Sequence, residues 1–182
     1  MQEEYEQSVE FTRAVVQGLD VQNGLVRVGA VAFSSQIVGQ FYMNSNLNSA
    51  QAVYNSLDFY DVFSTTNTPA ALQDAYSVQF TPLKGDRPSI PDVLIIVTDG
   101  YSNVNQTYTV PNAVMLKNSG VTIYAIAVGL SPQWTELDAM ASSPNTQYVI
   151  PLPTIGNITS TANMLLNELC GPTGTIIMPP SN

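Results

Sequence analysis

The chain has 182 residues, 45% of them hydrophobic, which is enough for one folded domain with its own core and excludes a disordered chain. Its 14 acidic residues outnumber the 5 basic ones, and the net charge of -9 argues against nucleic acid or an anionic membrane as a partner. Histidine is absent, which excludes serine–histidine and cysteine–histidine catalysis and the usual zinc sites.

Membrane insertion is not expected, because no apolar run approaches the roughly 18 to 20 residues of a membrane helix. The sequence also lacks Gly-x-x-x-x-Gly-Lys, Gly-x-Gly-x-x-Gly and Gly-x-Ser-x-Gly, the signatures of common nucleotide-binding and hydrolase sites. Its carboxylates are scattered rather than paired. We therefore expect a protein that is not an enzyme.

Two kinds of pattern alternate along the chain. Helical periodicity predicts helices over residues 3–19, 48–57, 68–80, 110–118, 133–141 and 159–169. Apolar runs predict strands over residues 25–33, 36–42, 93–97, 121–128 and 147–150. The first two strands are close enough to form a hairpin. This order predicts a doubly wound α/β fold, in which helices cover both faces of a mostly parallel sheet with one antiparallel edge strand.

The first predicted helix has an apolar stripe at helical spacing. Its members are Tyr5, Val9, Thr12, Val16 and Leu19. Three glutamates lie in the first turn, where the helix dipole favours negative charge. We expect the stripe to face the core.

The strand over residues 93–97 is the centre of the pattern. Its sequence, VLIIV, shows no polar alternation, which is typical of a strand buried on both faces. It runs into Thr98-Asp99-Gly100, which places a carboxylate at the edge where open α/β sheets bind ligands. The alternative is that Asp99 only caps a turn.

Four segments in this order resemble the von Willebrand factor type A domain, including the integrin inserted domains. They are RVGAVAFS (27–34), TNTPAAL (66–72), VLIIVTDG (93–100) and GVTIYAIAVG (120–129). The resemblance covers nearly the whole chain. It implies a domain over residues 1–171, incomplete at its N-terminus, followed by a C-terminal tail over residues 172–182.

The resemblance also implies a metal-ion-dependent adhesion site. In the family, a divalent cation, usually Mg²⁺, is held by an Asp-x-Ser-x-Ser motif, by a loop threonine and by the aspartate of the Thr-Asp-Gly turn. By match, Thr66 and Asp99 are the candidate metal ligands here, and the alternative for Thr66 is a loop hydroxyl with local hydrogen bonds only. Asp-x-Ser-x-Ser is absent, so we expect binding of Mg²⁺, Mn²⁺ or Ca²⁺ to be weak or absent.

In the family, that motif follows a central strand, and here Met1 stands almost where the motif should end. The missing strand would lie between residues 25–33 and 93–97. Three sources are open: an upstream segment of a longer chain, a partner chain, or Thr175-Ile-Ile-Met178 of the tail. An upstream segment is favoured, because Cys170 corresponds to a cysteine that many extracellular members pair with one ahead of the first strand.

The resemblance implies a protein-binding module for adhesion or extracellular-matrix contacts, whose protein ligand supplies an acidic side chain. A metal-independent structural or interaction scaffold is the alternative. Ser34, Tyr101, Ser102 and Asn103 are expected to form the partner-binding rim. An extracellular or secreted location is expected, although the residues after Met1 show no signal peptide.

Overall fold

A computed structural model of the chain describes residues 2–59 and 65–170. The α-helices are α1 (Gln2–Gln17), α2 (Ala50–Ser56), α3 (Thr68–Asp74), α4 (Thr109–Asn118), α5 (Trp134–Met140), α6 (Asn145–Tyr148) and α7 (Ile158–Cys170). The strands are β1 (Ala30–Phe33), β2 (Ile37–Phe41), β3 (Val93–Thr98), β4 (Thr122–Val128) and β5 (Val149–Leu152). A π-helix (Ala75–Gln79) continues α3, and 3-10 helices cover Pro82–Lys84, Gln106–Tyr108 and Ile155–Asn157. Within these residues, no helix combines the length and apolar character needed to span a bilayer.

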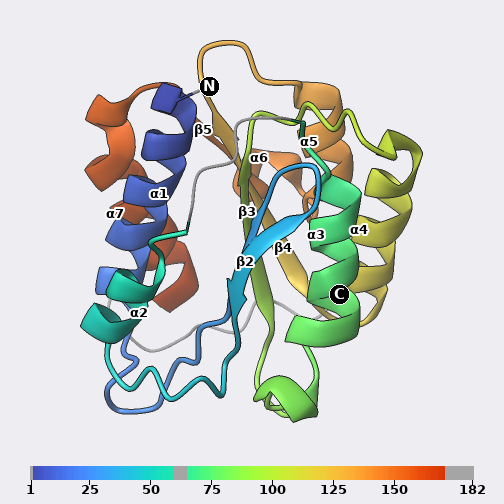
Figure 1. Cartoon of the computed structure of the whole chain (residues 1–182). Coiled ribbons are helices and arrows are strands. Elements are labelled where there is room, and N and C mark those ends of the chain that lie inside the picture. Colours follow the sequence, from blue (N-terminus) through green and yellow to red (C-terminus); the bar gives the residue numbers. More distant parts are fainter. Residues whose placement is uncertain (1, 60–64, 171–182) are drawn as a thin grey trace.

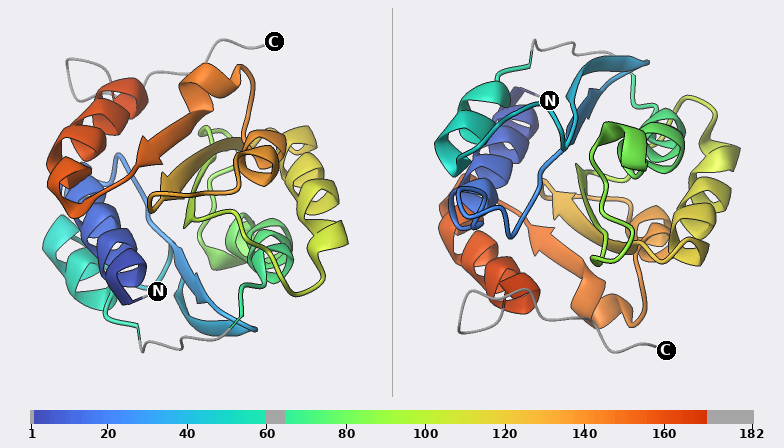
Figure 2. Two further views of the ribbon diagram at one scale, coloured as in Figure 1. Left: turned by 90° about the horizontal axis from the view of Figure 1, so that it is seen from above. Right: turned by 90° about the horizontal axis from the view of Figure 1, so that it is seen from below.

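Helices lie on both sides of the strands (Figure 1). On one side, α1 packs against α7 and α2, and on the other, α4 packs against α3 and α5. The views along the strands in Figure 2 show the same separation. Strands β3, β4 and β5 are parallel and adjacent in that order, whereas β1 and β2 form an antiparallel hairpin. The predicted doubly wound fold with an antiparallel strand is confirmed.

The strands form two separate groups. Among the described residues, β3 pairs only with β4, β1 pairs only with β2, and no ladder joins β1 to β3. The gap lies between β1 and β3, where the family resemblance implies a further strand. The strand predicted over residues 25–33 is also too long, since only Ala30–Phe33 is a strand. Within the part of the chain that the structure describes, residues 25–29 pair with no strand.

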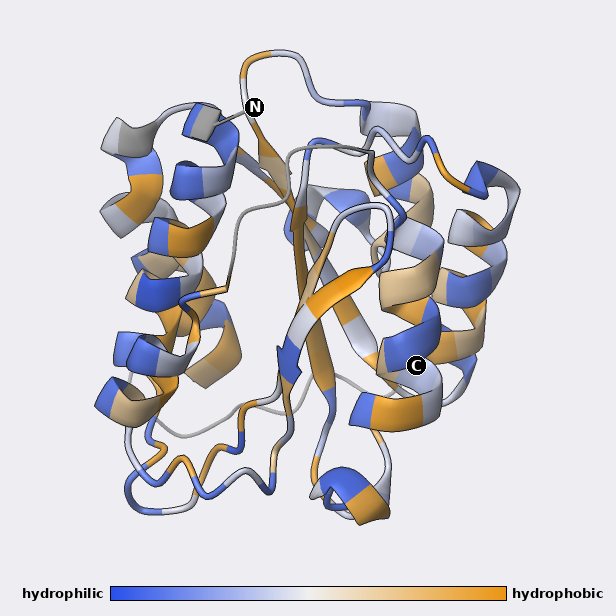
Figure 3. Ribbon diagram, in the orientation of Figure 1, coloured by the Kyte–Doolittle hydropathy of each residue, from blue (hydrophilic) through white to orange (hydrophobic). Residues whose placement is uncertain are grey.

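Burial follows this division. Six of the seven residues of β4 are buried, because β4 has a neighbour on each side and helices on each face. All four residues of β1 and four of the six in β3 are only half-buried. Figure 3 shows hydrophobic residues along the strands and on the helix surfaces that face them. The apolar sequence of β3 predicts a strand that is buried on both faces. The strand is less buried than that, and one of its edges is unpaired among the described residues.

Two predicted elements differ in detail. The helix predicted over 68–80 changes at Ala75 into a π-helix, in which the Phe80 N–H donates to the Ala75 carbonyl at 3.0 Å. The strand predicted over 147–150 begins at Val149, because Asn145–Tyr148 forms the short helix α6. Tyr148 there packs edge-to-face on Tyr124, with ring centroids 4.9 Å apart. The predicted tail over 172–182, with its Thr175–Met178 segment, lies outside the described residues.

Candidate functional site

Loops at the carboxyl ends of β1 and β3 meet above the gap. From here on, the name rim covers the four expected partner-binding residues together with the two candidate metal ligands. Its members are Ser34, Thr66, Asp99, Tyr101, Ser102 and Asn103. The turn after β1 is tied to the loop before α3. The backbone N–H of Asn67 donates to the Ser34 carbonyl at 2.7 Å, and the Ser34 hydroxyl donates to the Thr65 carbonyl at 3.1 Å. Asn67 also caps α3, its side chain accepting from Ala70 N at 3.1 Å, so this loop is fixed by the helix it begins.

The loop after β3 joins the same cluster through Asn103. Its side-chain oxygen accepts from Thr66 N at 2.8 Å, and its own N–H donates to the Thr66 carbonyl at 3.0 Å. This two-way pairing holds the Thr66 backbone against the loop that follows Asp99. Sequence reasoning placed Asn103 on the rim but missed this bridging role, for which the sequence carries no local signal.

Asp99 caps its own turn with one carboxylate oxygen. Oδ1 accepts from Tyr101 N at 3.0 Å, the geometry of an Asx turn. The Asp99 carbonyl accepts from Gln133 N at 2.7 Å, which fixes the turn to the start of α5. Gly100 follows with φ of 80°, a value that favours glycine. The turn-capping role considered for Asp99 is therefore present.

Thr66 and Asp99 line the same cavity, at its rim end. They would supply a hydroxyl and a carboxylate, both hard oxygen donors suited to Mg²⁺. Among the described residues, no group of three or more acidic, cysteine or histidine side chains could hold a metal ion. The chain's own donors near Asp99 therefore fit a divalent cation only in part.

A buried carboxylate supports the loop after Asp99. Glu136 of α5 accepts hydrogen bonds from Ser102 N at 3.2 Å, from the Ser102 hydroxyl and from Gln106 Nε2 at 3.2 Å. The Thr109 hydroxyl donates in turn to Ser102 Oγ at 3.2 Å. These contacts orient the loop from beneath. Sequence reasoning missed Glu136, whose only sequence signal is an acidic residue in the first turn of a short helix.

The rim residues differ in accessibility. Ser34 and Ser102 have exposures of 6% and 4%, so their side chains lie below the surface. Tyr101 is 50% exposed, and Asn103 is exposed as well. The side chains that the rim presents to solvent are thus those of Tyr101 and Asn103.

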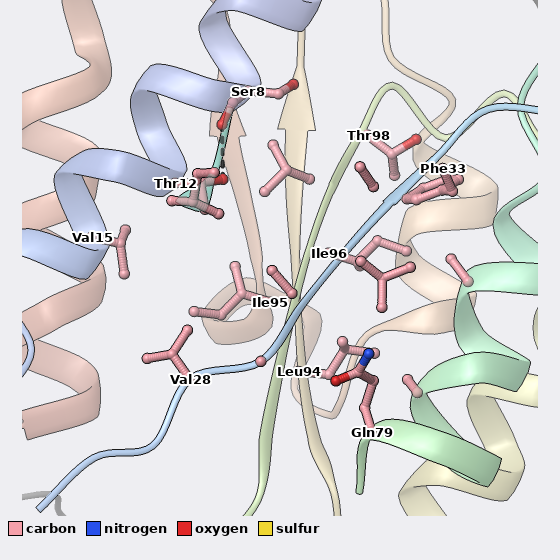
Figure 4. A pocket seen from close by; sticks show the side chains of 18 of the residues that line it. Ser8, Thr12, Val15, Val28, Phe33, Gln79, Leu94, Ile95, Ile96 and Thr98 are labelled. Atoms are coloured by element: carbon pink, nitrogen blue, oxygen red, sulfur yellow. Dashed lines mark hydrogen bonds between the residues drawn. The ribbon is translucent and has the colours of Figure 1, made fainter. Parts of the chain in front are cut away.

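A cavity of about 620 Å³ extends beneath the rim, between β1 and β3. We call it the central cavity. Its lining comes from α1, residues 26–34, β3, α3 with the π-helix that continues it, and the last two residues of α7, Leu169 and Cys170. Figure 4 shows Val15, Val28 and Ile95 among the apolar side chains that line it. The predicted inner stripe of α1 borders this space, which is why Tyr5, Val9 and Thr12 are only half-buried.

Charged groups lie at the other end of the central cavity. Burial and the neighbouring Asp86 carboxylate raise the pKa of Asp92 to about 6. Arg27 donates to the Gly85 carbonyl at 2.8 Å, and Arg87 donates to carbonyls of the turn before β1 at 2.9 and 2.8 Å. Cys170 is a free, buried thiol whose pKa is raised by burial.

Comparison with known proteins gives one family. The model for the von Willebrand factor type A domain matches residues 1–163. Human von Willebrand factor A domain-containing protein 2 is 36% identical over 146 residues, covering 80% of this chain and 18% of that protein. The human collagen alpha-5(VI) chain is 33% identical over 144 residues, covering 78% of this chain and 5% of that protein. The chain thus spans less than a fifth of either relative.

Solved structures share the fold. Proximal thread matrix protein 1 from the mussel byssus superposes with a TM-score of 0.80 at 23% identity, covering 92% of this chain and 43% of that one. A structure of the same mussel protein with a zinc-occupied MIDAS motif superposes with a TM-score of 0.77 at 23% identity, again covering 92% of this chain and 43% of that one.

Proposed function

Because the chain belongs to the von Willebrand factor type A domain family, we propose that it is a protein-binding module for adhesion or extracellular-matrix contacts, acting outside the cell. The proposed contact surface is the rim, with Tyr101 and Asn103 as its exposed side chains. The relatives and neighbours support this class, since they include a collagen chain and a thread matrix protein. Non-enzymatic binding agrees with the absence of histidine.

The observation that carries this proposal is the hydrogen-bonded network of loops at the carboxyl ends of β1 and β3. Ser34, Asn103 and Glu136 hold three loops of distant sequence origin in one arrangement. A surface whose loops are fixed before binding loses less conformational entropy when a partner docks. The rim is therefore suited to recognition.

Within the rim we propose a partial metal-ion-dependent adhesion site formed by Thr66 and Asp99. The mussel protein, which shares this fold, has been solved with a zinc-occupied MIDAS motif, and this supports a divalent cation as the ligand. A cation held there would offer an open position to a carboxylate of the protein ligand. With two donors from this chain, its affinity should be weak.

Calorimetric titration with MgCl₂ and MnCl₂ tests the metal site. The 182-residue chain should show no micromolar binding, and Asp99→Ala should leave the titration unchanged. Asp138→Ala, which removes an exposed carboxylate from α5 and not from the turn after β3, is the matched control. Micromolar affinity that disappears in Asp99→Ala and persists in Asp138→Ala would show that the site is complete.

One observation favours a metal-independent scaffold as the second candidate: Asp99 Oδ1 already holds Tyr101 N. Binding of the chain to immobilised collagen and to a solubilised matrix preparation, with and without EDTA, separates the two candidates. A rim contact predicts that Tyr101→Ala weakens binding. Tyr76→Ala is the control, because Tyr76 is also exposed (40%, against 50% for Tyr101) but lies in the π-helix, away from the rim. Equal effects of both substitutions would argue against the rim.

A further inference from the structure

Two triplets of the chain fit the acceptor sequence for asparagine-linked glycosylation, Asn-x-Ser/Thr with x other than proline. They are Asn105-Gln-Thr and Asn157-Ile-Thr. The first stands where the 3-10 helix before α4 begins, and the second stands where α7 begins. Such triplets are common by chance, so the surroundings of each asparagine decide whether it is a site.

Asn105 is open to solvent, as are the other two residues of its triplet. It stands directly before a 3-10 helix, where an asparagine side chain often caps the helix, but it makes no capping hydrogen bond. Its φ of 53° is left-handed, a conformation that asparagine adopts more readily than most residues. A glycan added to the emerging chain needs room on the folded one, and this exposed position provides it.

Asn157 is tied more closely to its neighbours. Its side-chain oxygen accepts from the Thr154 hydroxyl at 2.7 Å, and its carbonyl accepts from the Ser160 hydroxyl at 2.9 Å. The middle residue of this triplet, Ile158, is half-buried. Of the two asparagines, Asn105 is therefore the acceptor that the fold leaves open.

The helix that follows Asn105 has an exposed apolar face without charge. Val110, Val114 and Met115 of α4 are exposed, and Tyr108, just before the helix, is 60% exposed. Residues 100–116 contain no Asp, Glu, Lys or Arg, in a chain whose net charge is -9. α4 lies at the outer side of the molecule in Figures 1 and 2. An apolar face in this position favours association in water unless something covers it.

We propose that Asn105 carries an N-linked glycan, which covers this face of α4. The inference rests on the proposed location outside the cell, because the sugar is transferred on the secretory route. The donor is an oligosaccharide carried on a lipid diphosphate. The Asn105 Nδ2 attacks the anomeric carbon of its first sugar and loses one proton. A C–N bond forms, the bond from that carbon to the diphosphate oxygen breaks, and the lipid diphosphate leaves with the electron pair.

The local geometry brings the first sugar to an aromatic ring. The Tyr108 N–H donates to the Asn105 carbonyl at 2.9 Å. A turn closed in this way brings its first and last Cα atoms within about 7 Å of each other. The Tyr108 ring is therefore within reach of the first sugar, and the C–H face of a sugar packs on aromatic rings. α4 has 10 residues, a length of about 15 Å that an oligosaccharide of several sugars covers.

Peptide mass spectrometry of the secreted chain tests the site. The 182-residue chain, carried into the secretory route of cultured animal cells by a cleavable signal, should leave the cell with a glycan on Asn105. Enzymatic release in heavy-oxygen water converts a glycan-bearing asparagine to labelled aspartate, which identifies the position. Thr107→Ala should abolish the glycan, and Thr107→Ser, which keeps the triplet, should retain it. An unmodified Asn105, or a glycan on Asn157 alone, would overturn the proposal.

Sedimentation velocity tests whether the glycan covers α4. The secreted Thr107→Ala chain should form dimers or larger species at concentrations where the Thr107→Ser chain is monomeric. Adding Val114→Lys to Thr107→Ala places a charge on the face and should restore the monomer. Gln51→Lys, which adds the same charge at an exposed position of α2, is the matched control and should not. Enzymatic release of the glycan from the folded wild-type chain gives the same comparison if Thr107→Ala folds poorly. Identical sedimentation with and without the glycan would refute the covering role.

This inference and the proposed function fail separately. Because the added signal carries the chain into the secretory route, occupancy of Asn105 is measured independently of where the native protein resides. An unmodified Asn105 counts against the glycan and leaves the rim proposal as it stands. Loss of matrix binding in a chain that carries the glycan counts against the rim alone.

Discussion

Removal of the Glu136 carboxylate should destabilise the domain, because the carboxylate holds the loop that follows Asp99. In Glu136→Ala, the Ser102 N–H and hydroxyl lose their acceptor, and Ser102 is only 4% exposed. Each buried donor left unpaired costs about 1–3 kcal/mol, and water entering the space left by the side chain recovers part of this. We expect a loss of about 3 kcal/mol of unfolding free energy. For a chain of this length that lowers Tm by about 6–12 °C.

Urea denaturation and thermal melts followed by circular dichroism measure this loss. Asp138→Ala removes an exposed carboxylate from the same helix and should change stability by less than about 0.5 kcal/mol. Glu136→Gln keeps an acceptor of similar shape and should fall between the two. If Glu136→Ala were as stable as Asp138→Ala, the carboxylate would not support the loop, and the rim would lose its fixed geometry as an argument for recognition.

Four further substitutions test other parts of the structure. Gly100→Ala should lower the free energy of unfolding, measured by urea denaturation, by about 2 kcal/mol or more, because φ is 80° and the new Cβ would lie 2.8 Å from the Gln133 carbonyl oxygen. Gly120→Ala is the control for backbone strain without a clash, because φ there is 96° and a Cβ would meet no atom within 4 Å. The raised pKa of Asp92, about 6, means that the folded state binds its proton more tightly than the unfolded state, so stability should fall as pH rises from about 4 to 6. Asp92→Asn should flatten that slope, by no more than about 1 kcal/mol because the group is partly solvated. Arg87→Ala, which removes two hydrogen bonds to the turn before β1, should lower hydrogen-exchange protection of β1 and β2 more than that of β4.

Sequence periodicity predicts most elements within a few residues, because burial of one face controls both the pattern and the structure. It is wrong where pairing decides the outcome. Residues 25–29 have a strand sequence but pair with no strand among the residues that the structure describes, and they are not a strand. On α1, Tyr5, Val9 and Thr12 of the predicted stripe are half-buried at the central cavity, and Phe11, outside that stripe, also lines the cavity and is fully buried.

The sequence predicts those site residues that have a local sequence signal. A strand followed by Thr-Asp-Gly places Asp99 at the sheet edge, and the threonine before a helix start places Thr66 in a loop. The contact between Thr66 and Asn103 joins residues 37 positions apart, and that between Ser102 and Glu136 joins residues 34 apart. No periodicity encodes such pairs, since they depend on how the loops pack after the sheet has formed. Metal binding by Thr66 and Asp99 stays a prediction.

The two groups of strands explain why the rim and the central cavity belong together. Among the described residues, the groups are joined at the rim end through Thr66 and Asn103 and at the far end through Arg27 and Arg87, with no backbone ladder between. Each rim loop starts where one wall of the cavity ends: Ser34 follows β1, and Asp99 follows β3. A change in the spacing of these two walls would therefore move both loops.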